Sequence, residues 1–441
     1  MSSVLIHNAR ILTLAEGSVP RRGAEANNLS VIERGFIRLD GDCVSAIGEG
    51  EPAGELFEPS SSECESHDDR AHVTINAHGR VVMPAFIDAH THACWAGDRL
   101  DEWDMKRAGK SYLDILNAGG GIMSTVRAVR GASEDDLSAA LQIRAAAMAN
   151  AGTLCAEVKT GYGLSTASER LMWNSINDAQ ASIDAPSLYP TLLLGHAIDP
   201  DVPDFIDHTI HETLPTLCAE IETPGVVDAY CEEGAWSVED CQRLFERAQS
   251  LDWSFRVHAD QFNSLGMTPL AVEMGAISVD HLEASTEKDL KTLAESVTFG
   301  VMLPACAFHL DDRYAHGRLF MDMGGALVIA SNWNPGSAPC FSMPFVISLA
   351  VRKLGLTVQE AITACTINAK ALLNANDAFP GMRSYGRLKE NDCFAQFIML
   401  RHTDERMLAY EFGGDPVQLV VSDGRILKWT GDDSTRTIIK P

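Results

Sequence analysis

The chain has 441 residues, 46% of them hydrophobic and 22% charged, which suffices for a large buried core and excludes disordered, collagen-like and miniature disulfide-stabilised proteins. Its 35 basic and 61 acidic residues give a formal net charge of −26. A charge of this sign repels nucleic-acid phosphates and anionic lipid headgroups, so neither nucleic acid nor a membrane is an expected partner.

The apolar runs, the first residues and the cysteines of the sequence indicate in which cellular compartment the protein is expected. No stretch approaches the roughly 18 consecutive apolar residues that a membrane-spanning helix needs, and residues 1–7 lack the basic and long apolar segments of a secretory signal. The 11 cysteines are scattered without CxxC pairs, which indicates reduced thiols packed in a core rather than a disulfide framework. We therefore expect a soluble cytoplasmic protein.

Both ends of the chain have patterns typical of short strands. Residues 4–14 and 35–47 predict strands with turn residues between them, and residues 412–429 have the same pattern. We predict that residues 1–80 and 380–441 together form one small β-sandwich domain. Within the first part, residues 49–70 are rich in Glu, Ser, Pro, Gly and Asp, which predicts a surface loop or a flexible insertion.

Residues 81–379 have a different pattern, in which apolar segments of strand length alternate with longer helical stretches. Helices are predicted at residues 133–150, 237–251 and 286–295, each beginning with a Ser or Thr cap and an acidic first turn. The alternation predicts a catalytic (β/α)₈ TIM barrel. The alternative, an open doubly wound sheet, would have a glycine-rich loop where this chain has Ala89-His-Thr-His. The eight predicted barrel strands are residues 81–89, 153–159, 189–195, 226–231, 253–258, 277–280, 297–303 and 326–331.

Polar side chains follow seven of these eight strands. Because barrel enzymes build their sites at the carboxyl ends of the strands, we predict an active site at this rim. The segments are Asp88-Ala-His90-Thr-His92, Lys159-Thr-Gly-Tyr162, Gly195-His196, Glu232-Glu233, His258-Ala-Asp260-Gln261, Asp280-His281-Leu-Glu283 and Ser331-Asn332-Trp333-Asn334.

Three histidines in this set suggest a metal centre. His90 and His92 are two residues apart on an extended segment, so both side chains point to one face and can bind one ion. An HxH pair alone also occurs by chance, but His258 at another strand end supplies a third imidazole. Three neutral imidazoles suit Zn²⁺ or Fe²⁺ and leave a position for water, whose pKa a metal can lower to roughly 7.

Seven motifs are distributed over almost the whole chain. They are Pro84-Ala-Phe-Ile-Asp-Ala-His-Thr-His92, Ala96-Gly-Asp-Arg99, Ala118-Gly-Gly-Gly-Ile122, Lys159-Thr-Gly-Tyr-Gly-Leu164, His258-Ala-Asp-Gln261, Asp280-His-Leu-Glu283 and Asn334-Pro-Gly-Ser337. Together these motifs resemble one enzyme family, the imidazolonepropionases of histidine degradation in the amidohydrolase superfamily. The resemblance implies hydrolysis of the ring amide of a five-membered imidazolone propionate, giving N-formimino-glutamate.

The resemblance also implies residue roles. His90, His92 and His258 would bind the metal, and His281 would transfer a proton. Two-metal relatives use a carboxylated lysine on the fourth strand, and residues 226–231 contain no lysine, so one ion is expected. The substrate contacts would be Arg99, Tyr112, Tyr162, His196, Gln261, Asn334, Gly336 and Ser337.

Chemistry agrees with several of these roles and leaves alternatives open. Arg99 offers a planar fork for the propionate carboxylate, although it could instead pair with Asp98 or Asp101 at the surface. Glycines on both sides of Tyr162 predict an irregular, approachable loop. Instead of contacting the substrate, Tyr112 and Tyr162 could be aromatic residues of the core. Likewise, His196 and His281 could be core histidines whose hydrogen bonds are satisfied within the protein.

One residue departs from the family pattern. The family's strand-eight motif carries Asp at Asn332, where the carboxylate completes the metal site and accepts a proton from water. An amide can coordinate weakly through oxygen but is not a useful base near neutral pH. An engineered substitution, an inactive ligand-binding homologue and a natural enzyme with altered chemistry all remain open, and Trp333, Cys94 and Trp95 favour natural divergence.

Divergence has a chemically defined candidate, a 2-thioxo-imidazolidinone (thiohydantoin) propionate from breakdown of a sulfur-containing histidine derivative. Hydroxide attack between the ring nitrogens would expel sulfide, which needs less help from a base than an amide nitrogen does. The thiols of Cys94 and Cys306 could make the pocket more polarizable, which would suit a sulfur-containing ring, or they could be packing residues.

We predict catalytic roles for His281, Asn332 and Gln261, and we expect Asn332 to be a further metal ligand. We also expect the protein to be a homodimer that acts on a small molecule.

Overall fold

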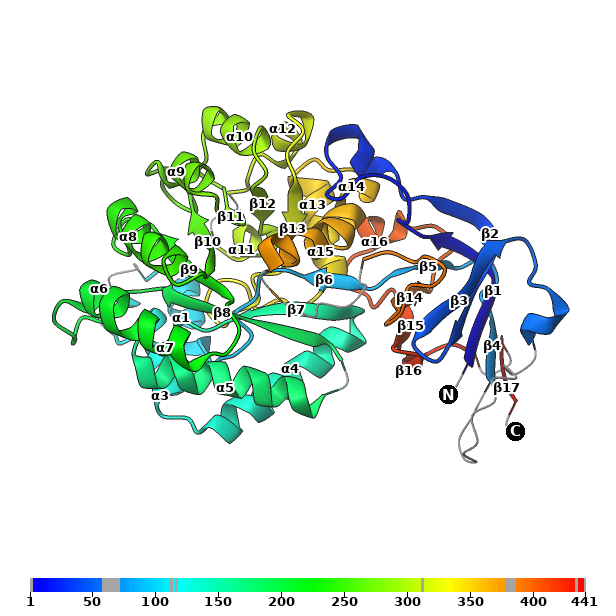
Figure 1. Ribbon diagram of the computed structural model, residues 1–441, viewed down its shortest axis with the longest axis horizontal. Helices are drawn as coiled ribbons and strands as arrows, with labels where there is room; N and C mark the ends of the chain where they lie inside the picture. The colour runs from blue at the N-terminus through cyan, green and yellow to red at the C-terminus, as the bar shows by residue number, and fades with distance from the viewer. Residues whose placement is uncertain are drawn as a thin grey trace.

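The computed structural model describes residues 3–57, 72–110, 114–115, 118–183, 185–310, 313–377, 379, 386–432 and 435–439. Its larger unit is an eight-stranded parallel sheet surrounded by helices (Figure 1). Thr91 and Trp333, just beyond the first and last strands, form a parallel bridge, so the sheet is a nearly closed (β/α)₈ barrel, as predicted. In spatial order the strands are β6 (Phe86–Asp88), β7 (Thr153–Lys159), β8 (Ser187–Gly195), β9 (Val226–Cys231), β10 (Ser254–Ala259), β11 (Ser278–His281), β12 (Phe299–Met302) and β13 (Leu327–Ile329).

Helices follow the barrel strands and begin where the sequence predicts. Ser133, Ser237 and Thr286 each accept a hydrogen bond from the backbone N–H three residues later, which satisfies one free donor of the helix that follows. The helices are α1 (Leu100–Arg107), α3 (Ile122–Arg130), α4 (Glu134–Asn150), α5 (Thr166–Ser182), α6 (Phe205–His208), the π-helical turn η3 (Thr209–Thr213), α7 (Leu214–Glu220), α8 (Val238–Gln249), α9 (Met267–Met274), α10 (Glu287–Ala294), α11 (Pro304–His309), α12 (Gly317–Asp322), α13 (Met343–Lys353), α14 (Val358–Ala364) and α15 (Ile367–Leu373).

The two ends of the chain form a second, nine-stranded sheet beside the barrel (Figure 1). The C-terminal strand β14 pairs antiparallel with β5, and β17 pairs antiparallel with β4. The prediction that both ends of the chain contribute to one additional β domain is therefore confirmed, whereas its form as a β-sandwich and the exact domain boundaries stay predictions. The elements are β1 (Ser3–Leu12), η1 (Gly23–Asn27), β2 (Val31–Asp40), β3 (Cys43–Glu49), η2 (Gly54–Phe57), β4 (His72–Asn76), β5 (Val81–Pro84), η4 (Ala375–Asp377), β14 (Gln396–Leu400), α16 (Met407–Tyr410), β15 (Val417–Ser422), β16 (Arg425–Trp429) and β17 (Arg436–Ile439).

Three expectations need correction. The predicted strand at residues 81–89 is two strands, because β5 pairs in the terminal sheet while β6 begins the barrel. The predicted strand at residues 35–47 covers parts of β2 and β3, which form an antiparallel hairpin. Cys43 and Cys393 form a disulfide, contrary to the expectation of reduced thiols, since their backbones meet in an isolated β-bridge. Of the predicted insertion at residues 49–70, residues 58–70 lie outside the described part.

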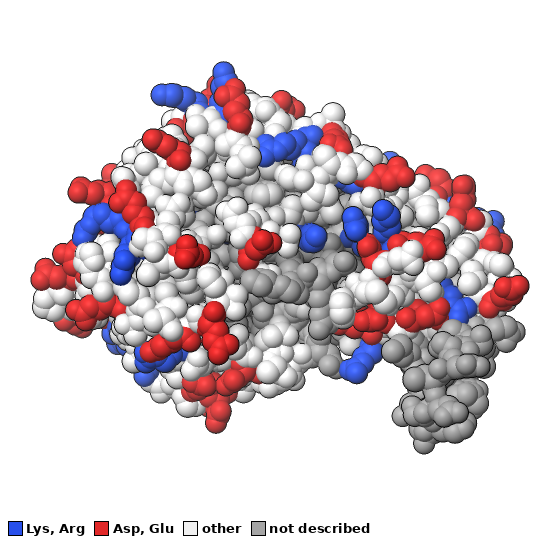
Figure 2. Space-filling model, viewed as in Figure 1, with Lys and Arg blue, Asp and Glu red and all other residues white. Residues whose placement is uncertain are grey.

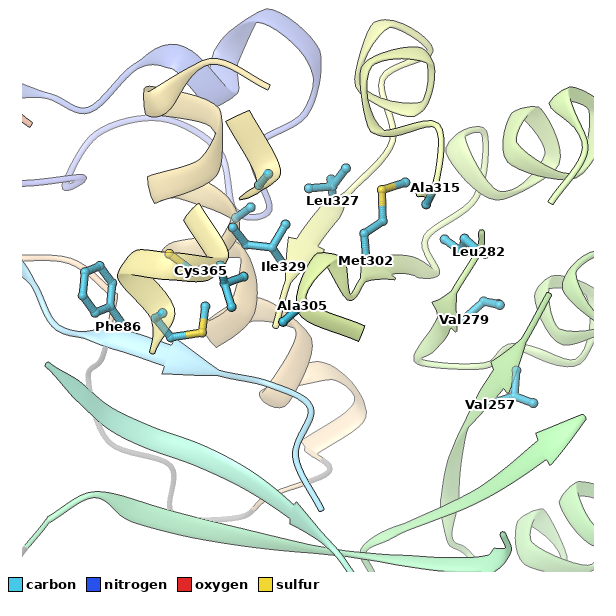
Figure 3. Packing of buried hydrophobic residues seen from close by; sticks show 14 of the residues in the cluster. Phe86, Val257, Val279, Leu282, Met302, Ala305, Ala315, Leu327, Ile329 and Cys365 are labelled. Carbon is cyan, nitrogen blue, oxygen red and sulfur yellow. The ribbon is translucent and has the colours of Figure 1, made fainter. Parts of the chain in front are cut away.

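The barrel strands are buried on both faces. Along β13, Leu327 and Ile329 belong to one apolar cluster and Val328 to another, as the two-residue period of a strand requires. Figure 3 shows part of the first cluster, in which Met302 of β12 lies between the β13 side chains Leu327 and Ile329 on one side and Val279 of β11 on the other. Burying each such aliphatic side chain contributes about 1.5–3 kcal/mol to stability.

The surface reflects the acidic composition. On the face in Figure 2, acidic and basic side chains are interspersed over the barrel helices and the terminal sheet.

The described part of the chain contains no helix with both the length and the apolar character needed to cross a bilayer.

Candidate active site

The interior of the barrel carries ionisable side chains at alternate positions of its strands. Asp88 and His90 follow this spacing at the end of β6, as do Arg256 and His258 on β10, and all four are nearly fully buried. His90 Nδ1 lies 2.5 Å from Asp280 Oδ2, although β6 and β11 are not neighbours in the sheet. A contact between distant strands places these groups inside the barrel.

Four histidines gather there. The ligand atoms of His90, His258 and His281 all lie within 4.8 Å of one another, which is compatible with one metal ion. His92 reaches the same group, because its Nε2 is 3.4 Å from His258 Nε2. The structure thus brings together the three predicted ligands and adds His281, which sequence reasoning treated only as a proton-transfer residue.

The backbone fixes Asn332 beside these histidines. Its N–H donates to the carbonyl of His90 at 3.0 Å, and the N–H of His92 donates to the carbonyl of Trp333 at 2.9 Å. Asn332 has a φ of 56°, a left-handed conformation that Asn tolerates better than most residues. Its position follows from these bonds, which close the barrel between the first and last strands.

The donor atoms of this site fit a cation. Asn332 Oδ1 and His90 Nε2 are buried and have no hydrogen-bond partner within the described ranges. Leaving such groups unpaired costs about 1–3 kcal/mol each, a cost that coordination would remove. Imidazole nitrogens with an amide oxygen suit a borderline divalent ion.

Burial also keeps the imidazoles neutral. It lowers the pKa of His90 and His258 well below the usual value, and the nearby charge of Lys159 adds to the effect. Burial lowers the pKa of His92 as well, with a further contribution from His196. The pKa of His196 falls to about 4, chiefly through burial. At neutral pH these rings therefore retain a lone pair for coordination or hydrogen bonding.

His281 has an unusual backbone conformation at the end of β11. Its φ is 90° and that of Leu282 is 71°, which are strained values for residues other than glycine. His281 Nδ1 lies 3.3 Å from Glu283 Oε1, so Glu283 can fix the orientation of the ring. Gln261, the other predicted catalytic residue, donates to Cys306 Sγ at 3.5 Å.

The Tyr162 loop is held by a residue that the sequence analysis missed. Glu169 accepts hydrogen bonds of 2.8 Å from the backbone N–H groups of Gly161, Gly163 and Leu164. The Tyr162 ring lies 5.1 Å from His196, centre to centre, so the loop brings both predicted substrate contacts together. A buried acid early in the following helix was the available signal, because it can bind free N–H groups of a preceding loop.

Arg99 lies at a cavity of about 430 Å³ beside the barrel mouth. It pairs with Glu102 through Nε at 2.6 Å, rather than with Asp98 or Asp101. Burial would raise the pKa of Glu102, but the Gly121 N–H and Arg99 outweigh burial and hold that pKa below its usual value. The cavity is lined by Trp95, Asp98, Arg99, Leu100, Glu102, Trp103, Lys106, His309, Pro335, Gly336 and Pro339.

The segment after β13 forms the opposite wall of this cavity. A side chain at Gly336 would meet Arg99 Nη1 at 3.0 Å, so glycine permits their close approach. Asn334 Oδ1 accepts from the N–H groups of Gly336 and Ser337, at 2.9 and 2.7 Å, which shapes the turn. The remaining predicted contact, Tyr112, lies outside the described residues.

The chain resembles known proteins both in sequence and in three-dimensional structure. No protein-family model matches it. It is 36% identical to the imidazolonepropionase of Herpetosiphon aurantiacus over 93% of both chains, and 34% identical to that of Rubrobacter xylanophilus over 97% of this chain and 99% of the relative.

Solved structures support the fold. The chain aligns with 5-methylcytosine deaminase from Klebsiella pneumoniae at a TM-score of 0.68 and 14% identity, over 97% of this chain and 98% of that one. N-isopropylammelide isopropylaminohydrolase from Burkholderia multivorans aligns at a TM-score of 0.64 and 16% identity, over 97% and 99%.

Proposed function

Because the chain belongs to the imidazolonepropionase family of the amidohydrolase superfamily, we propose that it is a metal-dependent hydrolase of the ring amide in imidazolone propionate. The product is N-formimino-glutamate, as in histidine degradation. The observation that carries this proposal is the identity of 34–39% to imidazolonepropionases across most of the chain. The buried histidine cluster at the barrel mouth supports it.

The proposed cofactor is one divalent ion, Zn²⁺ or Fe²⁺, bound by His90, His92 and His258 with Asn332 as a weak further ligand. Such an ion supplies Lewis-acid activation of water near neutral pH. Lys159 supports a single-ion site, because its Nζ lies 2.6 Å from Glu157 and 2.8 Å from Asp228. Carboxylation of this amine would put an anion beside two carboxylates.

Side chains of the protein would carry out proton transfer and substrate binding. His281 faces Glu283 through Nδ1, which leaves Nε2 to accept a proton from the attacking water and return it to the departing ring nitrogen. Arg99 binds the propionate carboxylate at the cavity, with Gly336 at close approach. Tyr162, His196 and Gln261 contact the ring, and together with Tyr112, Asn334 and Ser337 they complete the proposed substrate contacts.

We also propose that this enzyme is cytoplasmic and acts as a homodimer, with a catalytic barrel at residues 81–379 and a terminal domain from residues 1–80 and 380–441. Light scattering coupled to gel filtration checks the dimer, and a monomeric mass at working concentration would contradict it.

Asn332 favours a second candidate substrate, the propionate of a 2-thioxo ring. The amide is not a base near neutral pH, and expulsion of sulfide makes a smaller demand on a base than expulsion of an amide nitrogen. Cys306 adds a sulfur atom to this side of the site, 3.5 Å from Gln261 Nε2. The ring size and the carboxylate arm are the same in both candidates, so the proposed role of Arg99 is common to them.

One assay separates the possibilities. The metal-loaded protein is incubated with imidazolone propionate and, separately, with its 2-thioxo analogue, while ring absorbance and free sulfide are followed. Loss of the oxygen ring without sulfide supports the first function, and sulfide release supports the second. Failure to consume either ring would contradict both and leave an inactive ligand-binding homologue.

A further inference from the structure

Five charged side chains lie deeper in the barrel, behind the histidine cluster. Each is at most 1% exposed, and together the two cations and three carboxylates carry a formal charge of −1. Burying so many charges costs several kcal/mol per ion unless each is paired and hydrogen-bonded, so an apolar interior would be the more stable filling. They are Glu157 and Lys159 of β7, Asp228 of β9, Arg256 of β10 and Asp280 of β11.

Two of the carboxylates each bind a histidine of the candidate metal site. Asp280 Oδ2 lies 2.5 Å from His90 Nδ1, and Asp228 Oδ1 lies 3.1 Å from His258 Nδ1. An imidazole that donates from Nδ1 has its lone pair on Nε2, which is the atom left for a metal. The two carboxylates therefore set both the tautomer and the orientation of these rings.

The cations hold these carboxylates in place. Lys159 Nζ donates to Asp228 Oδ2 at 2.8 Å and to Glu157 Oε1 at 2.6 Å. Arg256 pairs with Asp280, lies 3.3 Å from Glu157 and donates to the carbonyl of Ala89 at 2.9 Å. Glu157 is thus shared between the two cations and links the Asp228 and Asp280 sides.

The network also contacts the backbone of the HxH segment. The hydroxyl of Thr91, between His90 and His92, donates to the carbonyl of Glu157 at 2.7 Å. Ala89, whose carbonyl accepts from Arg256, directly precedes His90. His90 and His258 are therefore bonded directly to one continuous set of buried hydrogen bonds, which also holds the backbone on both sides of His90.

We propose that Glu157, Lys159 and Arg256 are positioning residues that set the affinity for the divalent ion by fixing the carboxylates behind His90 and His258. The proposal rests on the proposed metal-dependent function, but its test requires no substrate. Residues behind metal ligands commonly change metal affinity by 10–100-fold when they are altered.

Two substitutions separate positioning from charge. Glu157→Gln preserves the shape of the side chain and one acceptor oxygen but removes the negative charge that Lys159 and Arg256 share. Arg256→Lys preserves the charge but loses the planar group that reaches Asp280, Glu157 and the carbonyl of Ala89 together. A loss of affinity in Arg256→Lys therefore reports geometry, because the net charge is unchanged.

The control is Glu360→Gln. Glu360 is 3% exposed and pairs with Arg318, with Oε2 2.8 Å from Arg318 Nη1, at the start of α14. The control makes the same chemical change in an ion pair whose carboxylate is also buried but, among the described residues, does not contact the histidines.

The measurements are the dissociation constant for Zn²⁺, by competition with a chelator, and the visible spectrum of the Co²⁺-loaded protein. We expect about 10–100-fold weaker binding and shifted Co²⁺ bands in both network variants, with both readouts unchanged in Glu360→Gln. The circular dichroism of the metal-free proteins checks folding, and the two network variants provide independent tests if one fails to fold. Wild-type affinity and spectrum in a folded network variant would overturn the proposal, whereas failure to consume either ring would overturn only the proposed function.

Discussion

The metal-binding and substrate-binding halves of the candidate site are built from different parts of the chain. His90, His258 and His281 lie at strand ends and are at most 2% exposed, and His90 and His258 each contact a carboxylate from another strand. Arg99, Tyr162 and Gly336 lie on loops after the strands, and Arg99 lines an open cavity. In the proposed site the strands therefore hold the metal ligands, while the loops carry the groups proposed to bind the ring and its side arm.

Two arginines show the same contrast. Arg256 is buried inside the barrel, where its partners Asp280 and Glu157 are also buried, and no substrate can replace them. Arg99 pairs with Glu102 at the wall of a cavity, where a substrate carboxylate can approach the guanidinium. Pairing fixes the positions of buried groups around Arg256, whereas the guanidinium of Arg99 stays accessible from the cavity.

The largest expected effect follows from removing a metal ligand. In His258→Ala, two predicted histidine ligands remain of three, so we expect loss of the bound ion and roughly a 10³-fold or greater fall in kcat, because Lewis-acid stabilisation amounts to several kcal/mol. Elemental analysis and turnover are measured on the same preparation. Stoichiometric metal in the variant would remove His258 from the ligand set.

The next effect tests proton transfer within the metal-binding half. His281→Ala should lower kcat by roughly 10²–10⁴-fold while metal content stays at the wild-type level, because His281 is proposed to transfer a proton rather than to bind the ion. Rates and metal content are compared with wild type. Full activity would contradict the assignment, and loss of the ion would make His281 a ligand.

Asn332→Asp sharpens the choice of substrate. If imidazolone propionate is the substrate, the added carboxylate should raise its hydrolysis by roughly 10²–10⁴-fold, the usual contribution of a positioned base. If the 2-thioxo ring is the substrate, sulfide release should fall, because a second anion opposes ionisation of the bound water. Rates on both rings are measured, and an unchanged pair of rates would show that residue 332 takes no part.

The sequence predicted the bounds of several barrel strands, but it did not reveal the charged side chains within those strands. The predicted strands at residues 153–159 and 226–231 match β7 and β9, because apolar runs bounded by polar residues define both ends. Glu157, Asp228 and Arg256 were overlooked because charges within a strand resemble interruptions of an apolar run. For Glu157 and Arg256 the signal was their two-residue spacing from Lys159 and His258 on strands buried on both faces.

The loop half was predictable only through motifs. Arg99, Tyr162 and Gly336 were identified by resemblance, but their fixing partners Glu102 and Glu169 were not. Both acids contact backbone N–H groups of loops, and only the folded path of those loops brings donor and acceptor together. The junction between β5 and β6 was missed for a similar reason, since an apolar pattern does not show where a chain passes from one sheet to another.

A smaller effect is expected in the substrate-binding half. Arg99→Lys retains the charge but loses the planar fork, so binding of the propionate should weaken by about 1–3 kcal/mol, seen as a higher KM with little change in kcat. Arg107→Lys is the matched control, because Arg107 is the last residue of α1, the helix that begins directly after Arg99, and does not line the cavity. Equal KM values for Arg99→Lys and wild type would place Arg99 outside the substrate site.

The smallest effect concerns pH. Burial lowers the pKa of His90, His92 and His258 well below the usual 6.5, so protons compete with the ion only at a pH below these lowered values. We expect metal occupancy to stay constant as pH falls from about 7.5 to about 6, measured by equilibrium dialysis. Half-release near the ordinary histidine pKa would show that the cluster is solvated rather than buried.

The proposed ring opening would require a divalent ion at the histidine cluster as well as substrate binding by the loops. The decisive measurement is turnover of imidazolone propionate by one preparation, before chelation, after chelation and after return of one equivalent of divalent ion per chain. We expect activity to disappear with the ion and to return with one equivalent, yielding N-formimino-glutamate. Equal turnover by the metal-free protein, or no turnover by the reloaded protein, would contradict this expectation.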